Sequence, residues 1–209
     1  MRDAEERNCL RGPCRLTSKT AARPQVSAAP ADYMDERVCA RIGPARQDAR
    51  LIIFLDFDGV LHPDPCRDEQ LFEHAPRLAR ALEEFPEASV VLSTSWRTFL
   101  NFEQLVVPLE TDLRRRVIGV TPRFADFSPR RELVPYRRQA ECVQWLSENG
   151  MNDAAWVALD DRTSWFVPYC ENLVACDALV GFDDEVAGRL RTGLLRARRH
   201  MTLSLDAVL

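Results

Sequence analysis

Lysine is almost absent from this chain: of its 28 basic residues, Lys19 is the only lysine and all the others are arginines. Such a bias is typical of a GC-rich genome and indicates a bacterial source. Long apolar runs are absent too, so we expect no membrane-spanning helix, which needs about 20 apolar residues. The first ten residues are rich in charge and no apolar stretch follows them, so we also expect no secretory signal.

Paired cysteine motifs are missing as well. The seven cysteines form an odd set without a C-x-x-C pair, which argues against a disulfide framework or a zinc ribbon and favours a reducing, cytoplasmic location. Cys9 and Cys14 have no second cysteine or histidine pair nearby that would complete a metal site. Apolar residues make up 46% of the chain and charged residues 29%, a composition that is typical of a globular protein.

The chain divides into three parts by composition. Residues 1–48 show no sustained helical or strand periodicity, so we expect a disordered or loosely structured extension, with a short helix possible around 33–42. A domain over 49–200 and a C-terminal tail over 201–209 follow. Residues 1–50 carry ten basic and seven acidic side chains, whereas the remainder carries 18 and 25. This acidic body argues against a large nucleic-acid-coating surface but not against a local basic groove.

Strand and helix patterns alternate after residue 50. Short apolar runs predict buried strands at 51–55, 89–93, 116–120, 155–159 and 172–176. Helices are predicted at 76–85, 99–106, 109–115, 136–149 and from Asp183 or Asp184 onward, with a loop over 122–135. In the helix at 136–149 we expect Ala140, Val143 and Leu146 to face inward. This order predicts an α/β domain with a mainly parallel sheet.

Polar residues follow three of these strands directly. Asp56 follows the first strand, Ser93-Thr94-Ser95 the second, and Asp160-Asp161 the fourth. Ligands of open parallel sheets bind beyond the carboxyl ends of the strands, so these side chains should converge. Their hard oxygen ligands suit Mg²⁺. The pair Asp56 and Asp58 could divide phosphoryl chemistry between them, one attacking phosphorus and the other shuttling protons.

The segment Asp56-Phe57-Asp58-Gly59-Val60 resembles the D-x-D-G-[VT] motif of the haloacid dehalogenase-like (HAD) phosphohydrolase superfamily. The Ser/Thr strand end, a basic residue at a helix start and the acidic strand end follow in that superfamily's order, over roughly 51–197. The resemblance implies a HAD-like Rossmannoid three-layer sandwich, and the short insertions imply a capless or minimally capped site. Residues 92–97, Arg138-x-x-Glu141 and 156–161 look like the small HAD domains grouped with bacterial RNA-repair proteins.

The resemblance also implies roles for the residues near the first two motifs. Asp56 would be the nucleophile that forms an aspartyl-phosphate, and its carboxylate would bind Mg²⁺. Asp58 would be the general acid/base, with its backbone carbonyl on the metal. Thr94 would hydrogen-bond a phosphoryl oxygen. Ser93 is the substitute, because the alignment with the second motif of the superfamily could shift by one residue.

The third and fourth motifs leave more alternatives open. Asp161 would complete the Mg²⁺ site, with Asp160 as its partner or replacement. The third motif of the superfamily is usually a lysine, but Lys19 precedes the first motif. An arginine must then neutralise the nucleophile and hold a phosphoryl oxygen. Arg138 at the start of the helix before the acidic strand is the first choice and Arg137 the second, although a solvated helix face remains the alternative for Arg138.

Several other residues near these motifs have two interpretations. His62 lies either near the site entrance or in the core. Trp96 and Arg97 could stack on a nucleobase, although a core position is the more common one for such a tryptophan. The remaining tryptophans are expected in or near the core: Trp145, Trp156 and Trp165.

From these features we expect an Mg²⁺-dependent HAD-type phosphatase that acts on a large or accessible phosphorylated substrate, such as a nucleic-acid end or a phosphoprotein. The alternatives are a phosphotransferase and a catalytically idle HAD module that binds a phosphorylated partner. We expect no membrane partner, and the sequence leaves the oligomeric state open.

Overall fold

The computed structural model of this chain describes residues 51–127 and 136–206. The expectations for residues 1–48, including the helix around 33–42, lie outside these residues. Five parallel strands form one sheet in the order β3-β2-β1-β4-β5. They are β1 (Leu51–Leu55), β2 (Ala88–Leu92), β3 (Val117–Val120), β4 (Ala155–Asp160) and β5 (Leu173–Ala175). All five predicted strands are therefore confirmed.

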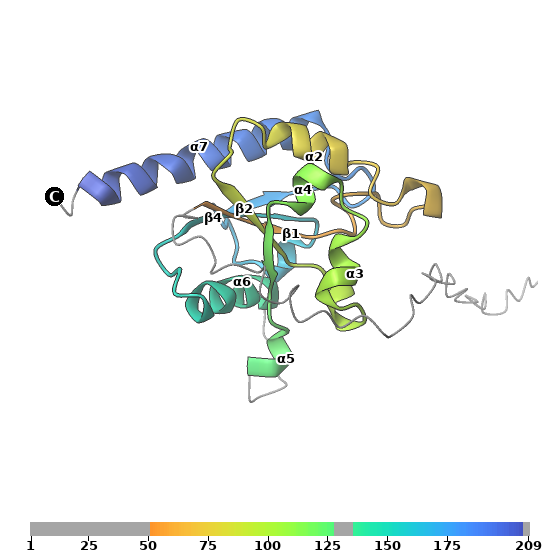
Figure 1. Cartoon of the computed structure of the whole chain (residues 1–209), viewed down its shortest axis with the longest axis horizontal. Helices are drawn as coiled ribbons and strands as arrows, with labels where there is room; N and C mark the ends of the chain where they lie inside the picture. The colour runs from red at the N-terminus through yellow and green to blue at the C-terminus, as the bar shows by residue number, and fades with distance from the viewer. Residues whose placement is uncertain (1–50, 128–135, 207–209) are drawn as a thin grey trace, which may run out of the picture. The chain divides into compact units, whose positions relative to one another are not determined.

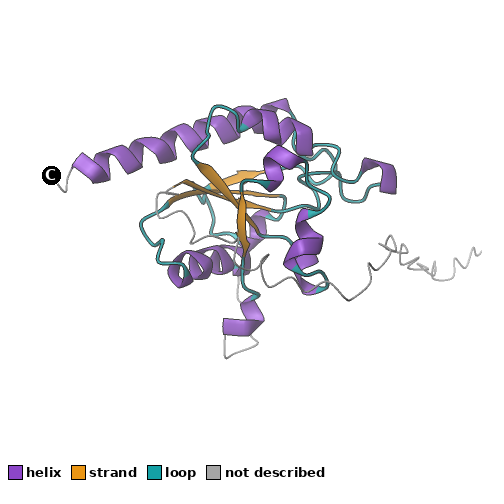
Figure 2. Cartoon of the chain, in the orientation of Figure 1, coloured by secondary structure: helices purple, strands orange, loops and turns teal. Residues whose placement is uncertain are grey.

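Helices cover both faces of the sheet (Figure 1; Figure 2). The α-helices are α2 (Ala75–Ala81), α3 (Phe102–Val106), α4 (Thr111–Arg114), α5 (Phe124–Phe127), α6 (Arg137–Glu148) and α7 (Asp184–Asp206). Three short 3₁₀ helices, η1 (Asp68–Gln70), η2 (Ser95–Thr98) and η3 (Thr163–Trp165), lie in the loops. Within the described residues, no helix is long and apolar enough to cross a membrane. The result is the α/β domain with a parallel sheet that the alternating pattern predicts, arranged as the three-layer sandwich that the resemblance implies.

Strand β1 is completely buried because both of its faces are covered. One face packs with α2 and α7 in a core cluster that includes Leu51, Ile53, Leu55, Leu78 and Leu190. The other face packs with α6 in a second cluster, where Phe54 meets the edge of Trp145 at a ring-centroid distance of 6.0 Å. Continuous apolar sequence, rather than alternation, is what a strand in this position requires.

The inward face of α6 differs from the predicted one. Val143 is 48% exposed, and the buried residues of this helix are Arg138, Glu141, Cys142, Trp145 and Leu146. The prediction is confirmed for Leu146 and wrong for Val143, because it followed apolar residues alone, whereas the buried stripe begins with two charged residues that face the carboxyl edge of the sheet. Gly150 follows α6 with a φ of 66°, as expected for a helix C-terminus.

Two further boundaries differ from the sequence-based expectation. Residues 124–127, expected in a loop, form α5, which Glu141 helps to start by accepting the backbone N–H of Phe124 at 2.9 Å. Helix α7 continues to Asp206, past residue 200 where we placed the end of the domain, since no glycine or proline interrupts it there. Its first turn is capped by Asp183, whose Oδ1 accepts the Val186 N–H at 2.8 Å.

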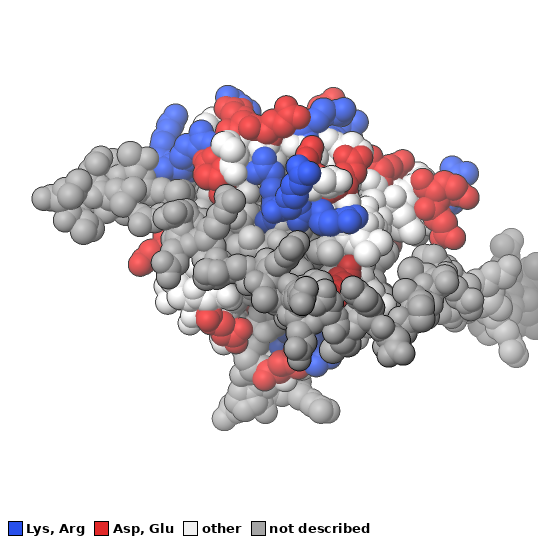
Figure 3. Space-filling view, in the orientation of Figure 1, with Lys and Arg blue, Asp and Glu red and all other residues white. Residues whose placement is uncertain are grey.

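Many of the arginines in this domain have structural partners. Arg116 donates hydrogen bonds to the carbonyls of Leu82, Phe85 and Ala88, and so provides partners for backbone carbonyl groups that follow α2. Arg191 on α7 binds the Glu84 carboxylate with two hydrogen bonds of 2.7 and 2.8 Å. Over the described part of the face in Figure 3, basic and acidic side chains are interspersed. The high arginine content therefore does not by itself indicate a nucleic-acid-binding surface.

Candidate active site

The sheet order places the candidate site at a topological switch point. From β1 the chain continues to β2 on one side of the sheet and later to β4 on the other. Hydrogen bonds between the strands keep the carboxyl ends of β1, β2 and β4 at the same height. The Asp56 N–H donates to the Leu159 carbonyl at 3.0 Å, and the Ser93 N–H donates to the Leu55 carbonyl at 2.7 Å. Ligands of open α/β sheets bind at such points.

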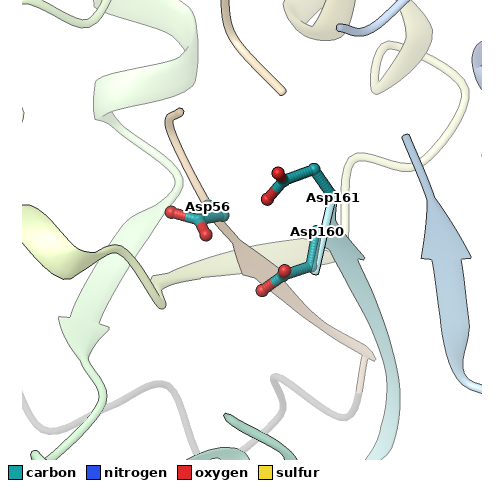
Figure 4. Close-up of side chains that lie close together, drawn as sticks. All are labelled: Asp56, Asp160 and Asp161. Atoms are coloured by element: carbon teal, nitrogen blue, oxygen red, sulfur yellow. The ribbon is translucent and has the colours of Figure 1, made fainter. Parts of the chain in front are cut away.

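Three carboxylates meet at this edge of the sheet. The side chains of Asp56, Asp160 and Asp161 come from the ends of β1 and β4 and lie side by side (Figure 4), with carboxylate oxygens within 4.8 Å of one another. Burial raises the pKa of Asp56 and, together with the charge of Asp56, that of Asp160 and of Asp161. The structure thus brings together the three carboxylates predicted to bind Mg²⁺, and this crowded set of hard oxygen donors fits such an ion.

Arg138 lies between two of these carboxylates. Its Nη2 donates to Asp56 Oδ2 at 3.0 Å, and its Nε lies 3.1 Å from Asp160 Oδ2. The Arg138 side chain is only 2% exposed, so the alternative of a solvated helix face is wrong for this residue. The third carboxylate, Asp161, has Arg162 Nε 3.3 Å from its Oδ2. Three carboxylates opposite two guanidinium groups leave an excess of negative charge, which a divalent cation would balance.

A tight turn carries the chain from Asp56 to Asp58 and then away from the site. The Phe57 carbonyl accepts the N–H groups of Val60 and Leu61 at 3.1 and 2.8 Å. Gly59 has a φ of 68°, and a Cβ placed there would lie 2.8 Å from the Cβ and Cγ of Asp161. Two features therefore require glycine at this position: the positive φ of the backbone and the close approach of the Asp161 side chain.

The side chain of Asp58 is directed to a different set of partners. It accepts hydrogen bonds from Trp96 Nε1 at 2.8 and 3.0 Å, from His62 Nε2 at 3.2 Å and from Ser95 Oγ at 3.3 Å. Burial by itself would raise the pKa of Asp58, but the hydrogen bonds from His62 and Trp96 lower it below the usual value. Its carboxylate is outside the group of three, which is compatible with an acid/base function.

The two hydroxyl candidates after β2 point to different neighbours. Thr94 is fully buried, and its hydroxyl lies close enough to Asp56 to help offset the rise in the pKa of that carboxyl. Ser93 faces α6, where its Oγ lies 3.8 Å from Cys142 Sγ. The structure therefore places Thr94, and not its substitute Ser93, beside the predicted nucleophile.

The sequence did not predict the buried ion pairs that connect Arg138, Glu141 and Arg97. Glu141 Oε2 lies 2.5 Å from Arg97 Nη2 and 3.7 Å from Arg138 Nη1. The Arg97 side chain is 7% exposed and also donates to the Thr94 carbonyl, so stacking of Arg97 on a nucleobase was a wrong expectation. Burial of Glu141 and Arg138 on one turn of α6 is the signal that a search for apolar faces overlooks.

The surroundings of Trp165 were also unforeseen. Its ring is half-buried and lies 3.9 Å from the guanidinium carbon of Arg137, with the corresponding atoms of Arg138 at 5.1 Å and Arg162 at 5.4 Å. Arg137 is exposed and forms no ion pair with any residue that the structure describes. An arginine–tryptophan cluster thus adjoins the carboxylates.

Comparison with known proteins agrees with this geometry. The family model described as the HAD domain in Swiss Army Knife RNA repair proteins matches residues 52–187, which include every site residue discussed above. The chain belongs to this family. No curated protein and no solved structure matches it. The expected HAD fold and the likeness to RNA-repair HAD domains are both confirmed, and membership indicates a HAD-type phosphohydrolase in general.

Two further expectations concern the cysteines and the accessibility of the site. The four cysteines in the described residues are free thiols, consistent with the absence of a disulfide framework there. No cap domain is present between β1 and β2 in this HAD domain, where α2 is the one α-helix. Asp56 is nevertheless only 5% exposed at its side chain, whereas Asp58 is 35% exposed. The approach to the nucleophile is therefore narrower than an open, capless site suggests.

Proposed function

We propose that this HAD domain is an Mg²⁺-dependent phosphohydrolase that transfers the phosphoryl group of its substrate to Asp56 before water releases it. The observation that carries the proposal is the convergence of Asp56, Asp160 and Asp161, two of which, Asp56 and Asp160, contact the buried guanidinium of Arg138. A protein that only bound a phosphate group would have no need for so many carboxylates, because they repel an anionic ligand.

The chemistry follows from the positions of the side chains. A carboxylate oxygen of Asp56 attacks phosphorus, the bond to the leaving oxygen breaks, and protonated Asp58 supplies the proton which that oxygen takes up. The pKa of Asp58 is lowered in the free domain, and the negative charge of a bound phosphoryl group would favour its protonated form. In the second step Asp58 removes a proton from the water whose oxygen bonds to phosphorus. The bond between phosphorus and Asp56 breaks, which releases inorganic phosphate and restores both the Asp56 carboxylate and protonated Asp58.

Other groups would stabilise the phosphoryl charge. Arg138 would neutralise Asp56 and bind a phosphoryl oxygen, and Thr94 would donate a further hydrogen bond. When bound to Asp56, Asp160 and Asp161, Mg²⁺ would supply positive charge that offsets the repulsion between the carboxylates and a phosphoryl group.

The distribution of exposure supports a large substrate. The phosphoryl-binding end of the site is buried at Asp56, while Asp58, which faces the leaving group, is 35% exposed. The leaving group can therefore extend to the surface. Arg137 and Trp165 provide a cation and an aromatic ring next to Arg138, beside the carboxylates. Both suit a nucleotide chain, and the family is that of RNA-repair HAD domains. We therefore favour a phosphorylated nucleic-acid end as the substrate.

A phosphatase screen tests this proposal. The substrates are an aryl phosphate, 3′- and 5′-phosphorylated oligonucleotides and phosphopeptides, each with Mg²⁺ or with EDTA. We expect hydrolysis only with Mg²⁺, the highest kcat/KM for one oligonucleotide class, and a loss of several powers of ten in Asp56→Asn. Binding of phosphorylated oligonucleotides without turnover would instead support an idle module, and transfer to an added alcohol would support a phosphotransferase.

A further inference from the structure

The carboxylate of Asp58 is held by donors on both of its oxygens. Oδ1 accepts from Trp96 Nε1 at 2.8 Å and from His62 Nε2 at 3.2 Å. Oδ2 accepts from the same Trp96 N–H at 3.0 Å and from Ser95 Oγ at 3.3 Å. A half-exposed aspartate has freedom at both side-chain torsions, and these donors select one orientation.

The donors are themselves fixed by packing. The Trp96 ring meets the edges of Phe57 and Phe72 at centroid distances of 5.7 and 5.5 Å. His62 is 2% exposed, and its Nδ1 accepts the backbone N–H of Phe72 at 3.4 Å. With Nδ1 acting as an acceptor, the Nε2 proton faces Asp58. Phe72 thus sets the ring orientation of both donors.

We propose that Trp96 and His62 are positioning residues that hold the Asp58 carboxylate in the orientation in which it exchanges protons. For its catalytic consequence this inference rests on the proposed function. It explains why a tryptophan directly follows the Ser/Thr motif, where base stacking or simple core packing was the expectation. Neither residue touches Asp56 through a contact that the structure describes, so both act through Asp58.

The first test removes one N–H group and keeps an aromatic ring. Trp96→Phe should lower kcat by about 10- to 100-fold, a part of what acid–base catalysis contributes, and change KM less than about twofold. The matched control is Trp156→Phe, because Trp156 packs on Phe54 at a ring-centroid distance of 5.7 Å and is the second residue of β4, at the end of the strand away from Asp58. It should leave kcat within about twofold of wild type.

A double-mutant cycle separates positioning from a general structural effect. In an Asp58→Asn background, Trp96→Phe should have little further effect on the kcat for an aryl phosphate. An equal loss of kcat in both backgrounds would overturn the proposal. His62→Gln, which keeps a donor and an acceptor in line, should retain more activity than His62→Leu. Equal losses in these two variants would remove His62 from the proposal.

A spectroscopic arm does not depend on activity. Among the four tryptophan indole N–H resonances, the one lost in Trp96→Phe should shift in Asp58→Ala, because its carboxylate acceptor has gone. An unchanged resonance would overturn the proposal whatever the kinetics show. A wild-type protein without phosphatase activity would overturn the proposed function and the catalytic part of this inference, while the resonance would still show whether Asp58 is held by Trp96.

Discussion

Replacing Arg138 with alanine should both destabilise this HAD domain and slow its reaction. The guanidinium bonds Asp56 at 3.0 Å and lies 3.1 Å from a carboxylate oxygen of Asp160, and all three side chains are at most 5% exposed. Breaking a buried ion pair typically costs about 3–5 kcal/mol, because the partner charge stays buried without compensation. Protonation of one carboxylate limits this loss, because the pKa values of Asp56 and Asp160 are already raised.

The catalytic loss should be of similar size. Removal of one charged group that stabilises a transition state costs about 2–4 kcal/mol, which corresponds to a roughly 30- to 1,000-fold lower kcat/KM. Arg138→Lys should recover part of it, since a lysine keeps the charge but cannot reach both Asp56 and Asp160 with a planar fork.

The assays are urea denaturation with EDTA, followed by tryptophan fluorescence, and steady-state kinetics with an aryl phosphate. Arg115→Ala is the control, because Arg115 is 75% exposed and 3.5 Å from Asp112. It should change the free energy of unfolding by less than about 1 kcal/mol. Adding Asp160→Asn to Arg138→Ala should restore stability by removing one unpaired charge. The reasoning is refuted if Arg138→Ala unfolds like wild type and keeps its rate within about threefold.

Three further results are expected. Asp161→Asn should raise the melting temperature in EDTA, because burial and the charge of Asp56 raise the pKa of Asp161 and make its ionised form costly. The same substitution should reduce the rise in melting temperature that Mg²⁺ causes. A lower melting temperature of Asp161→Asn in EDTA would contradict the reasoning. The pKa of Asp58 is lowered, so its contribution to stability is complete above about pH 4 and is lost as the pH falls through the folded-state value. Asp58→Asn should therefore destabilise the domain at pH 7 and much less near pH 3 in urea titrations. Thr94→Val should lower kcat/KM by about 100-fold and Ser93→Ala by much less, and the reverse order would show that the hydroxyls are misassigned.

The strand framework and the main site residues could be predicted because both follow from local sequence. Runs such as 51–55 and 155–159 are apolar on both faces, which is the property of a central parallel strand. Residues that end neighbouring parallel strands must meet at one edge, so the proximity of Asp56, Thr94 and Asp160 could be predicted from the sequence. Arg138 was chosen for the third motif that the resemblance implies, since no lysine follows Lys19.

The remaining contacts join residues that are far apart in the chain. The Asp58–Trp96 bond spans 38 positions and the Arg138–Asp56 bond spans 82, and no periodicity encodes such distances. The predicted inward face of α6 included Val143 wrongly and left out Arg138 and Glu141, because a charged residue that is buried against a partner in another segment looks like a surface residue in the sequence. Helix α5 was missed for a similar reason, since its start depends on Glu141, 17 residues away.

The central claim is that Asp56 carries the phosphoryl group during turnover. The most direct measurement mixes the Asp58→Asn variant, in which release should be slowed, with Mg²⁺ and a radiolabelled aryl phosphate, and then quenches the reaction in acid. The account predicts a hydroxylamine-sensitive label on the peptide that contains Asp56, and no label when Asp56→Asn is added. Release of phosphate without any labelled protein, or a label on another residue, would contradict it.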